Sequence, residues 1–363
     1  MLIHCTKRAC ERLKITPPVA EKEFNPLYSW RLNIIEEGRQ RLVVFMNDAS
    51  RYCVALENIK ARDLAKLTKI FTERLREVLL AEQINPDVID RYLAELGEAE
   101  YFKNADKNMT ARLNKACETA KLGYHYENGY VNISRYVNRM LVGTKGSKDY
   151  FEPCETFHAM LAEYGLPLKQ CHAFEFDVEL DTKSGSVLRT IVVPADINFE
   201  QFATVIRKAF GWWNHKNRFM FMLCGSGGHG KLFLSQKRDE PSTITIPPTL
   251  VMKDVKLSDL VLNSHRIFEF LYDYAAQWKL CISLKADYLK YTGEIPCLKS
   301  GSGNAPPEDV GGEDGFAEFL YVLENGKSKE RREKTQWGKH CGYEIFDEDF
   351  EKIKREVELS LRW

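Results

Sequence analysis

Apolar and polar residues in the first 100 positions follow two periods, one typical of strands and one typical of helices. Over 39–57, the apolar run LVVFMN, turn-forming residues at 48–50 and the alternating run RYCVALEN predict a β-hairpin. From residue 62 onward, apolar side chains recur every three or four positions, which predicts a long amphipathic helix. Asn85 and Gly97 bracket a second helix, because an Asn side chain can cap a helix start and Gly readily ends one. Together these elements predict an α+β unit, a small sheet with helices on one side.

The second half shows the same mixture of periods. The runs AFEFDVEL and VLRTIVV, separated by the turn sequence DTKSGS, predict another hairpin. Asn198, followed by Gln201 three residues later, predicts a capping box at the start of the helix FEQFATVIRKAF. Further strands are expected at FMFML, KLFLS, RIFEFLYDY and WKLCISL, with helices at 316–326 and 349–363. Because turns join most strands and helices are inserted singly, the pattern favours an α+β fold over a doubly wound sheet.

The periodic pattern weakens between Gly143 and Gly165, where TKGSKDYFEP and the turn-like GLP occur. Such a stretch is typical of a domain boundary. We therefore expect an N-terminal domain over 1–145, a linker over 146–168 and a C-terminal domain over 169–363. Each domain is expected to be a mostly antiparallel sheet with packed helices.

Composition and charge remove several classes of function. The 52 Lys and Arg residues balance 52 Asp and Glu residues, so any basic surface that attracts nucleic acid must be local. No run reaches the roughly 18 apolar residues of a spanning helix, and the charged N-terminus does not fit a signal peptide. The ten cysteines contain no CxxC pair and are expected to be reduced thiols. These features predict a cytoplasmic protein with no membrane association and no cofactor.

A glycine-rich stretch over 225–231, GSGGHGK, fits the spacing of two phosphate-binding motifs, GxxxxGK and GxGxxG. A P-loop needs Ser or Thr after its lysine and opens a helix. Here Leu232 follows the lysine, and LFLS predicts a strand. A hairpin tip therefore explains the glycines without a ligand.

Carboxylates supply candidate chemistry in the second half. Glu308 and Asp309 stand between a proline pair and a glycine pair, a turn-forming setting that can fix acidic side chains in position. With Asp273 they could serve a metal-dependent hydrolase, whose candidate metal ligands are Cys297 and Asp309. A loop capped by its own side chains explains the same residues, and no GxSxG or HExxH motif occurs. A non-catalytic protein without a metal is therefore preferred to an enzyme.

Two stretches mix basic and aromatic side chains as nucleic-acid surfaces do, since cations neutralise phosphates and aromatic rings stack on bases. The candidate nucleic-acid-binding residues are Trp213, His215, Lys216, Arg218, Arg331, Arg332 and Trp337. Glu330 and Glu333 dilute the charge of the second stretch, which favours a solvated loop over 327–339. The final helix could pack on its own domain, bind another protein or support a homodimer.

Blocks from both halves resemble known families. VLRTIVVPADINFEQFATVIRKAFGW, FLYDYAAQWKLCISL and PCLKSGSGNAPPEDVGGEDGFAEFL are similar to the plasmid pRiA4b ORF-3-like family, also called passenger TnpR-like proteins. The resemblance implies a compact α+β fold and an association with plasmids and mobile elements. The chain departs from that family after FGW, where histidines are usual, and at Ala305, where a cysteine is usual. In the first half, MLIHCTK, YSW, VVFMND and ARLNKACE resemble a bacterial domain family of unknown function.

These observations favour a non-catalytic accessory or adaptor protein that binds another protein, nucleic acid or both. Its setting in a mobile element or a bacterial defence locus is implied by the resemblance alone. The alternative is the metal-dependent hydrolase, acting on nucleic acid or a nucleotide.

Overall fold

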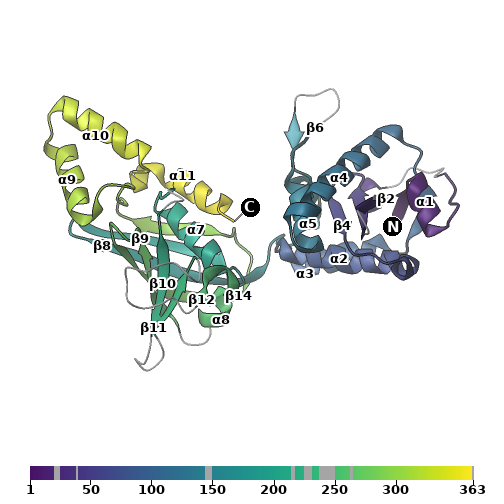
Figure 1. The fold of residues 1–363 in the computed structure, drawn as a ribbon, viewed down its shortest axis with the longest axis horizontal. Helices are drawn as coiled ribbons and strands as arrows, with labels where there is room; N and C mark the ends of the chain where they lie inside the picture. Colours follow the sequence, from purple (N-terminus) through teal and green to yellow (C-terminus); the bar gives the residue numbers. More distant parts are fainter. Residues whose placement is uncertain are drawn as a thin grey trace. The chain divides into compact units, whose positions relative to one another are not determined.

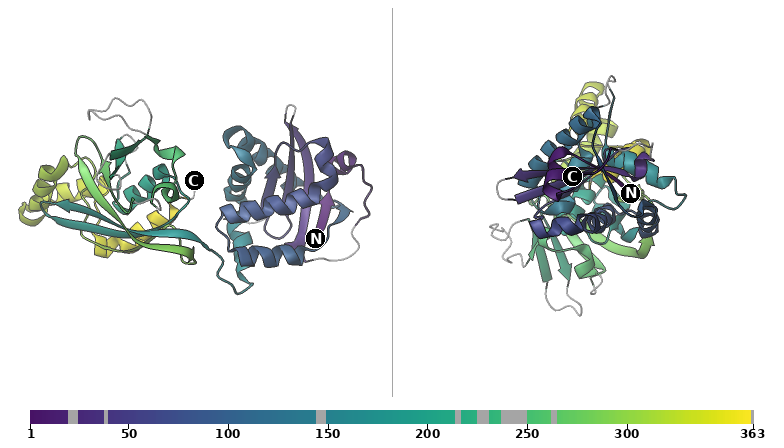
Figure 2. Two further views of the ribbon diagram at one scale, coloured as in Figure 1. Left: turned by 90° about the horizontal axis from the view of Figure 1, so that it is seen from below. Right: turned by 90° about the vertical axis from the view of Figure 1, so that its right-hand side faces the viewer.

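A computed structural model describes residues 1–19, 25–37, 40–143, 149–213, 217–224, 231–236, 250–261 and 265–361. The chain divides into two compact units, Met1–Gln170 and Cys171–Trp363, each with its own sheet and hydrophobic core (Figure 1; two further views in Figure 2). The predicted α+β class is confirmed. None of the helices in the described ranges has the length and apolar character that crossing a membrane requires.

The first unit is built on a five-stranded mixed sheet, ordered β4-β3-β2-β1-β5. Its strands are β1 (Leu2–Cys5), β2 (Ser29–Glu37), β3 (Gln40–Asn47), β4 (Cys53–Leu56) and β5 (Glu100–Lys103). The antiparallel pair of β3 and β4 confirms the predicted hairpin, and β2 also pairs antiparallel with β3. β1, however, runs parallel to both β2 and β5. Antiparallel pairing therefore describes only part of this sheet, because parallel pairs join segments distant in sequence, which a local pattern does not reveal.

Helices cover both faces of this sheet, not one face as the pattern predicted. The helices are α1 (Lys7–Leu13), α2 (Leu67–Ala81), α3 (Pro86–Leu96), α4 (Lys107–Tyr126), α5 (Gly129–Arg139) and α6 (Pro153–Ala162). α2, α3 and α6 pack around Trp30 and Phe71 on one face, and α4 and α5 pack around Leu113 and Ile133 on the other. The reason lies in β3, whose last six residues are all buried. A strand buried on both faces has a continuous apolar run, as LVVFM does here.

Side chains of α5 protect the outer edge of β4. The Asn138 Oδ1 accepts from the Cys53 backbone N–H at 2.6 Å, and its Nδ2 donates to the Cys53 carbonyl at 2.9 Å. The Ser134 hydroxyl oxygen accepts from the Ala55 N–H at 3.0 Å. These bonds replace those of a further strand and blunt an edge that could otherwise pair with another chain.

Of residues 146–168, predicted to be a linker, the described residues 149–168 contribute to the first unit. They include α6 and, in a short hairpin with β6 (Val142–Gly143), β7 (Tyr150–Phe151). Phe157 of α6 is fully buried and stacks on Tyr52 with ring centroids 4.5 Å apart. Pro153 begins the helix and Gly165, with φ of 72°, follows its end, so a proline and a glycine of the weakly periodic stretch flank a core helix.

The second unit contains an eight-stranded sheet, ordered β12-β11-β10-β13-β14-β8-β9-β15. All pairs are antiparallel except β11 with β12, and β8 with β9 forms the predicted hairpin. The strands are β8 (Cys171–Thr182), β9 (Gly185–Pro194), β10 (Phe219–Cys224), β11 (Lys231–Ser235), β12 (Leu250–Val251), β13 (Ile267–Tyr272), β14 (Trp278–Tyr291) and β15 (Cys297–Ser302).

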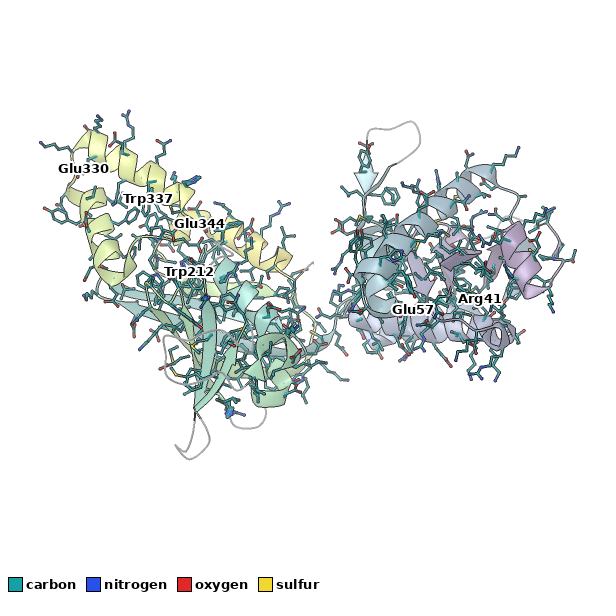
Figure 3. The ribbon with its side chains drawn as sticks, in the orientation of Figure 1. Arg41, Glu57, Trp212, Glu330, Trp337 and Glu344 are labelled. Atoms are coloured by element: carbon teal, nitrogen blue, oxygen red, sulfur yellow. The ribbon has the colours of Figure 1, made fainter. Side chains whose placement is uncertain are left out.

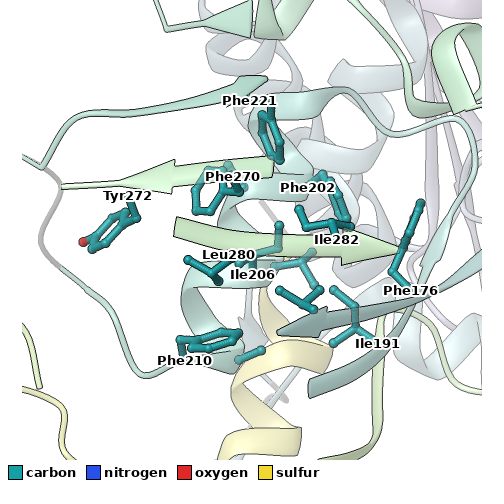
Figure 4. Close-up of a cluster of buried hydrophobic side chains, with 14 of the residues drawn as sticks. Phe176, Ile191, Phe202, Ile206, Phe210, Phe221, Phe270, Tyr272, Leu280 and Ile282 are labelled. Carbon is teal, nitrogen blue, oxygen red and sulfur yellow. The ribbon is translucent and has the colours of Figure 1, made fainter. Parts of the chain in front are cut away.

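Aromatic side chains fill the core between this sheet and its helices, as Figure 4 shows. The helices are α7 (Phe199–Ala209), α8 (Leu257–Val261), α9 (Gly312–Asn325), α10 (Ser328–His340) and α11 (Phe346–Leu359). The predicted capping box opens α7, with Asn198 and Gln201 exchanging hydrogen bonds of 3.0 and 2.9 Å. Phe202 of α7 lies between Phe176 and Phe221 of the sheet.

Residues 327–339 do not form the solvated loop predicted for them, because most of the segment is α10. Lys, Arg and Glu are strong helix formers, and their summed propensity outweighs the lack of apolar residues. Trp337 packs on Phe319 of α9, with ring centroids 5.8 Å apart. Gly338 permits close approach of the two helices, since a Cβ at this position would lie 2.6 Å from Phe319 Cζ.

Candidate functional site

The end of β13 carries a group of aromatic and polar side chains, which we call the Tyr272 cluster: Trp212, Asn217, Tyr272 and Glu308. The Tyr272 hydroxyl donates to Glu308 Oε1 and accepts from Asn217 Nδ2 at 3.3 Å. The Tyr272 ring stacks on Trp212, with centroids 4.4 Å apart and an interplanar angle of 4°. The Trp212 indole N–H donates to the Pro306 carbonyl at 2.9 Å. Figure 4 shows the Tyr272 hydroxyl pointing away from the core rings, so this residue joins the core to a polar loop.

Glu308 reaches the cluster from the loop between β15 and α9. Its backbone N–H donates to the Cys341 carbonyl at 2.8 Å, and its Oε2 accepts from the Trp213 backbone N–H at 2.7 Å. Burial and the nearby Glu308 carboxylate raise the pKa of Tyr272, so the hydroxyl stays a proton donor at neutral pH. The carboxylate thus fixes the end of β13 and the segment after α7 to the same loop.

Asp273 and Asp309, the other acids considered for catalysis, lie in neighbouring turns. Asp273 directly follows β13, and its Oδ1 accepts from the Ala275 N–H at 3.0 Å, which stabilises the turn into β14. Asp309 is exposed, and both residues have positive φ, 54° and 60°. A Cβ at Gly312 would lie 3.2 Å from the Ala276 carbonyl oxygen, so the two turns are in contact. The fold therefore brings the three predicted acids to one end of the second sheet.

Cys297 lies in the edge strand. It begins β15 opposite Val192 of β9 and is 9% exposed, and burial raises the pKa of its thiol. A protonated thiol is a poor metal ligand. Among the residues that the structure describes, no three His, Cys, Asp or Glu side chains are grouped so that they could hold a metal ion.

Two candidate nucleic-acid-binding residues flank the Tyr272 cluster. Trp213 is 40% exposed, and the Lys208 ammonium lies 3.6 Å from its ring centroid. Arg218 is exposed and directly precedes β10. Outside the described residues lie His215, Lys216 and positions 225–230 of the glycine-rich stretch.

The other candidates lie on α10, which Figure 3 marks with Glu330 and Trp337. Arg331 and Arg332 are exposed, and Arg331 also donates to the Glu324 carbonyl of α9 at 2.7 Å. Trp337 is half-buried against α9. Packing therefore accounts for the tryptophan, whereas the arginine side chains face solvent.

A second polar cluster, in the first unit, was not predicted from the sequence. Glu82 follows α2, and its Oε2 accepts from the Tyr52 hydroxyl at 2.9 Å and lies 2.7 Å from His158 Nε2. Burial favours a higher pKa for Glu82, but its hydrogen bond to His158 and the charges of His158 and Lys169 lower the pKa overall. Burial, followed by the charge of Glu82, raises the pKa of Cys154 to about 12, so this thiol is protonated at neutral pH. The cluster holds α6 against α2 and does not activate Cys154 as a nucleophile.

Two α+β units with these features define a two-domain protein whose halves match different families. A family model described as a domain of unknown function (DUF6933) matches residues 2–156. The model described as plasmid pRiA4b ORF-3-like protein matches residues 172–354, and the chain belongs to this family. Both resemblances noted in the sequence are thus confirmed.

Individual relatives cover about half of the chain. Uncharacterized protein y4hQ of Sinorhizobium fredii is 28% identical over 189 residues, which are 51% of this chain and 91% of that protein. A crystal structure of MM3350, a protein of unknown function from Methanosarcina mazei Go1, is 21% identical with a TM-score of 0.38. That match covers 46% of this chain and 89% of the other.

Proposed function

We propose that the chain is a non-catalytic accessory protein that binds nucleic acid through the solvent-facing side of α10. The observation that carries this proposal is the positive charge of residues 327–339. This segment contains six Lys or Arg residues and only two Glu residues, whereas the whole chain has no net charge. Exposed cations on one helix can neutralise successive phosphates. The plasmid in the name of the family supports a setting in a mobile element, and a bacterial defence locus is the related possibility.

The contacts on α10 leave most of this charge available. Arg332 and Lys339 are exposed. Lys329 forms an ion pair with Glu333 at 3.9 Å, but both side chains are largely exposed, so the pair contributes little. Trp337 attaches the helix to α9. A helix that packs on α9 along one side and is exposed to solvent along the other is a suitable carrier for a backbone-binding surface.

Two of the candidate catalytic carboxylates have bonds that account for their positions. Glu308 accepts from a backbone amide and from the Tyr272 hydroxyl, and Asp273 caps its own turn. These contacts support the preference for binding over hydrolysis. A cytoplasmic location, a partner protein and a homodimer remain predictions for the same protein.

The test is fluorescence anisotropy of a labelled duplex and a labelled single strand, measured between 50 and 300 mM salt. If four cations contact phosphates of the duplex, the logarithm of the binding constant should fall with log salt with a slope of about −3.6. Arg332→Gln with Lys339→Gln should reduce that slope by about 1.8. The matched control, Lys253→Gln with Lys256→Gln, removes the same charge from exposed positions elsewhere. It should leave the slope of the salt dependence unchanged.

Three results would overturn parts of the proposal. Equal weakening by both double variants would mean that binding does not use α10. No binding of nucleic acid, together with capture of an acidic protein by α10, would make a protein the partner. Metal-dependent cleavage of the oligonucleotide that is lost in Asp309→Asn, with the fold intact, would favour the hydrolase.

A further inference from the structure

Arg207 is a buried cation whose Nε–H has no hydrogen-bond partner among the residues that the structure describes. It lies in the last turn of α7 and is 8% exposed. Its guanidinium carbon lies 5.4 Å from the Phe219 ring centroid, and its shielded Nε–H has no hydrogen-bond partner. Within the described ranges, no carboxylate forms an ion pair with it. Burying an unpaired charge costs several kcal/mol, so such a group is normally paired or neutralised.

The same unit contains a buried arginine that is satisfied. Arg189 is 1% exposed, and its Nε donates to the Ala209 carbonyl at 2.9 Å. One of its terminal nitrogens donates to the carbonyls of Leu188 and Ser302 at 2.8 and 2.9 Å. The fold can therefore provide carbonyl acceptors for a buried guanidinium, and it does so for Arg189 but not for the Nε of Arg207.

Near Tyr272, the Glu308 carboxylate accepts hydrogen bonds from groups other than Arg207. The charge of Arg207 acts on Tyr272, where it opposes the rise in pKa caused by burial and Glu308. The Glu308 carboxylate accepts from the Tyr272 hydroxyl and the Trp213 amide. Asn217 donates one amide hydrogen to Tyr272, and its amide group carries a second. The adjacent Lys208, by contrast, pairs with a glutamate of α11 at 3.0 Å.

We propose that Arg207 anchors a binding site for a small oxyanion, such as a phosphate group, with Asn217 as a second donor. A planar guanidinium presents a fork of N–H donors that matches two oxygens of phosphate. The anion would supply a counter-charge to Arg207, which forms no ion pair with a carboxylate of the described residues. This site is separate from α10 and does not depend on nucleic-acid binding there.

Two sources could supply this chemistry, free phosphate or the terminal phosphate of a nucleic-acid strand. Thermal unfolding of the full chain in inorganic phosphate, compared with chloride at equal ionic strength, tests the first. Competition between 5′-phosphorylated and unphosphorylated oligonucleotides of one sequence tests the second. A saturable rise in Tm with phosphate, or at least tenfold tighter binding of the phosphorylated strand, is the expected result.

The variant Arg207→Met retains a long apolar side chain against Phe219 and removes the donors. It should abolish the response to either phosphate source, whereas Lys253→Gln, which removes an exposed cation elsewhere in the second unit, should retain it. If Arg207→Met does not fold, titration calorimetry of the native chain and of Asn217→Ala provides the same test, and Asn217→Ala should weaken phosphate binding severalfold. No saturable response of the native chain to either source, or an unchanged response in Arg207→Met, would overturn the proposal.

Discussion

Removing one oxygen atom tests the role of the Tyr272 cluster. Tyr272→Phe keeps the ring that stacks on Trp212 but removes the hydroxyl that donates to Glu308 and accepts from Asn217. Glu308 is 8% exposed, so its Oε1 would lose a hydrogen bond in a largely dry environment. A hydrogen bond to a charged group contributes about 1.5 to 3 kcal/mol, and we expect a loss of about 2 kcal/mol.

The assay is unfolding followed by tryptophan fluorescence. Five of the six tryptophans lie in the second unit, and Trp212 contacts the altered ring, so the signal reports mainly on this unit. For a unit of about 190 residues, a loss of 2 kcal/mol corresponds to a decrease in Tm of about 4 to 8 °C. Tyr321→Phe, at a side chain that is 66% exposed, is the control and should stay within about 0.5 kcal/mol of the native chain.

The pH dependence and a mutant cycle add two checks. Because the pKa of Tyr272 is raised in the folded state, its contribution is complete below pH 10 and is lost as the pH rises through the folded value. The stability difference between native chain and Tyr272→Phe should therefore narrow above pH 10. Combining Tyr272→Phe with Glu308→Gln should give a coupling energy of about 1 to 2 kcal/mol. A coupling below about 0.5 kcal/mol would refute the inference that these two side chains stabilise each other.

Three further predictions concern other contacts. Glu82→Gln should destabilise the first unit by about 2 kcal/mol at pH 7. Because the pKa of Glu82 is lowered in the folded state by its contacts with His158, the difference in urea-unfolding free energy should shrink as the pH falls below about 4.5. Gly338→Ala should cost about 1 kcal/mol, since strain against buried Phe319 exceeds the gain in helix propensity, and hydrogen exchange along α10 should accelerate. Asn138→Ala leaves a buried N–H and carbonyl of β4 unsatisfied, and chemical denaturation should show a loss of about 2 to 3 kcal/mol.

Local patterns predicted those elements whose determinants are local. The hairpins, the helix after Asn85 and the capping box of α7 depend on residues only a few positions apart. The parallel strand β1 could not be found in this way, because its four residues pair with β5, almost 100 positions later. α10 was missed for another reason. Its residues have high helix propensity but almost no apolar periodicity, and apolar periodicity is the pattern that predicts the other long helices.

In the candidate site, too, the local sequence predicts turns but does not predict contacts between distant residues. The turn setting of Asp309 was readable from neighbouring Gly and Pro residues, and this residue does lie in a turn. Asp273, which the pattern places in the strand RIFEFLYDY, instead directly follows β13 and stabilises a turn. The role of Glu308 was not readable, because its partners Tyr272 and Trp213 are 36 and 95 positions away. A carboxylate in a rigid loop has the same local sequence whether it binds a metal or fixes a neighbouring strand. Only the fold distinguishes these two roles.

The local sequence places Arg207 on the apolar face of a helix, but it does not predict the role of this residue. Phe199, Phe202, Ala203 and Ile206 form the apolar face of α7, and an arginine one turn after Ala203 lies on that same face. A charge at such a position must be satisfied by the protein, be covered by a ligand or reach solvent. The sequence does not choose among these possibilities, because the acceptors come from distant strands, as they do for Arg189. The structure narrows the choice, since it gives the Nε of Arg207 no acceptor, and the phosphate titration decides what remains.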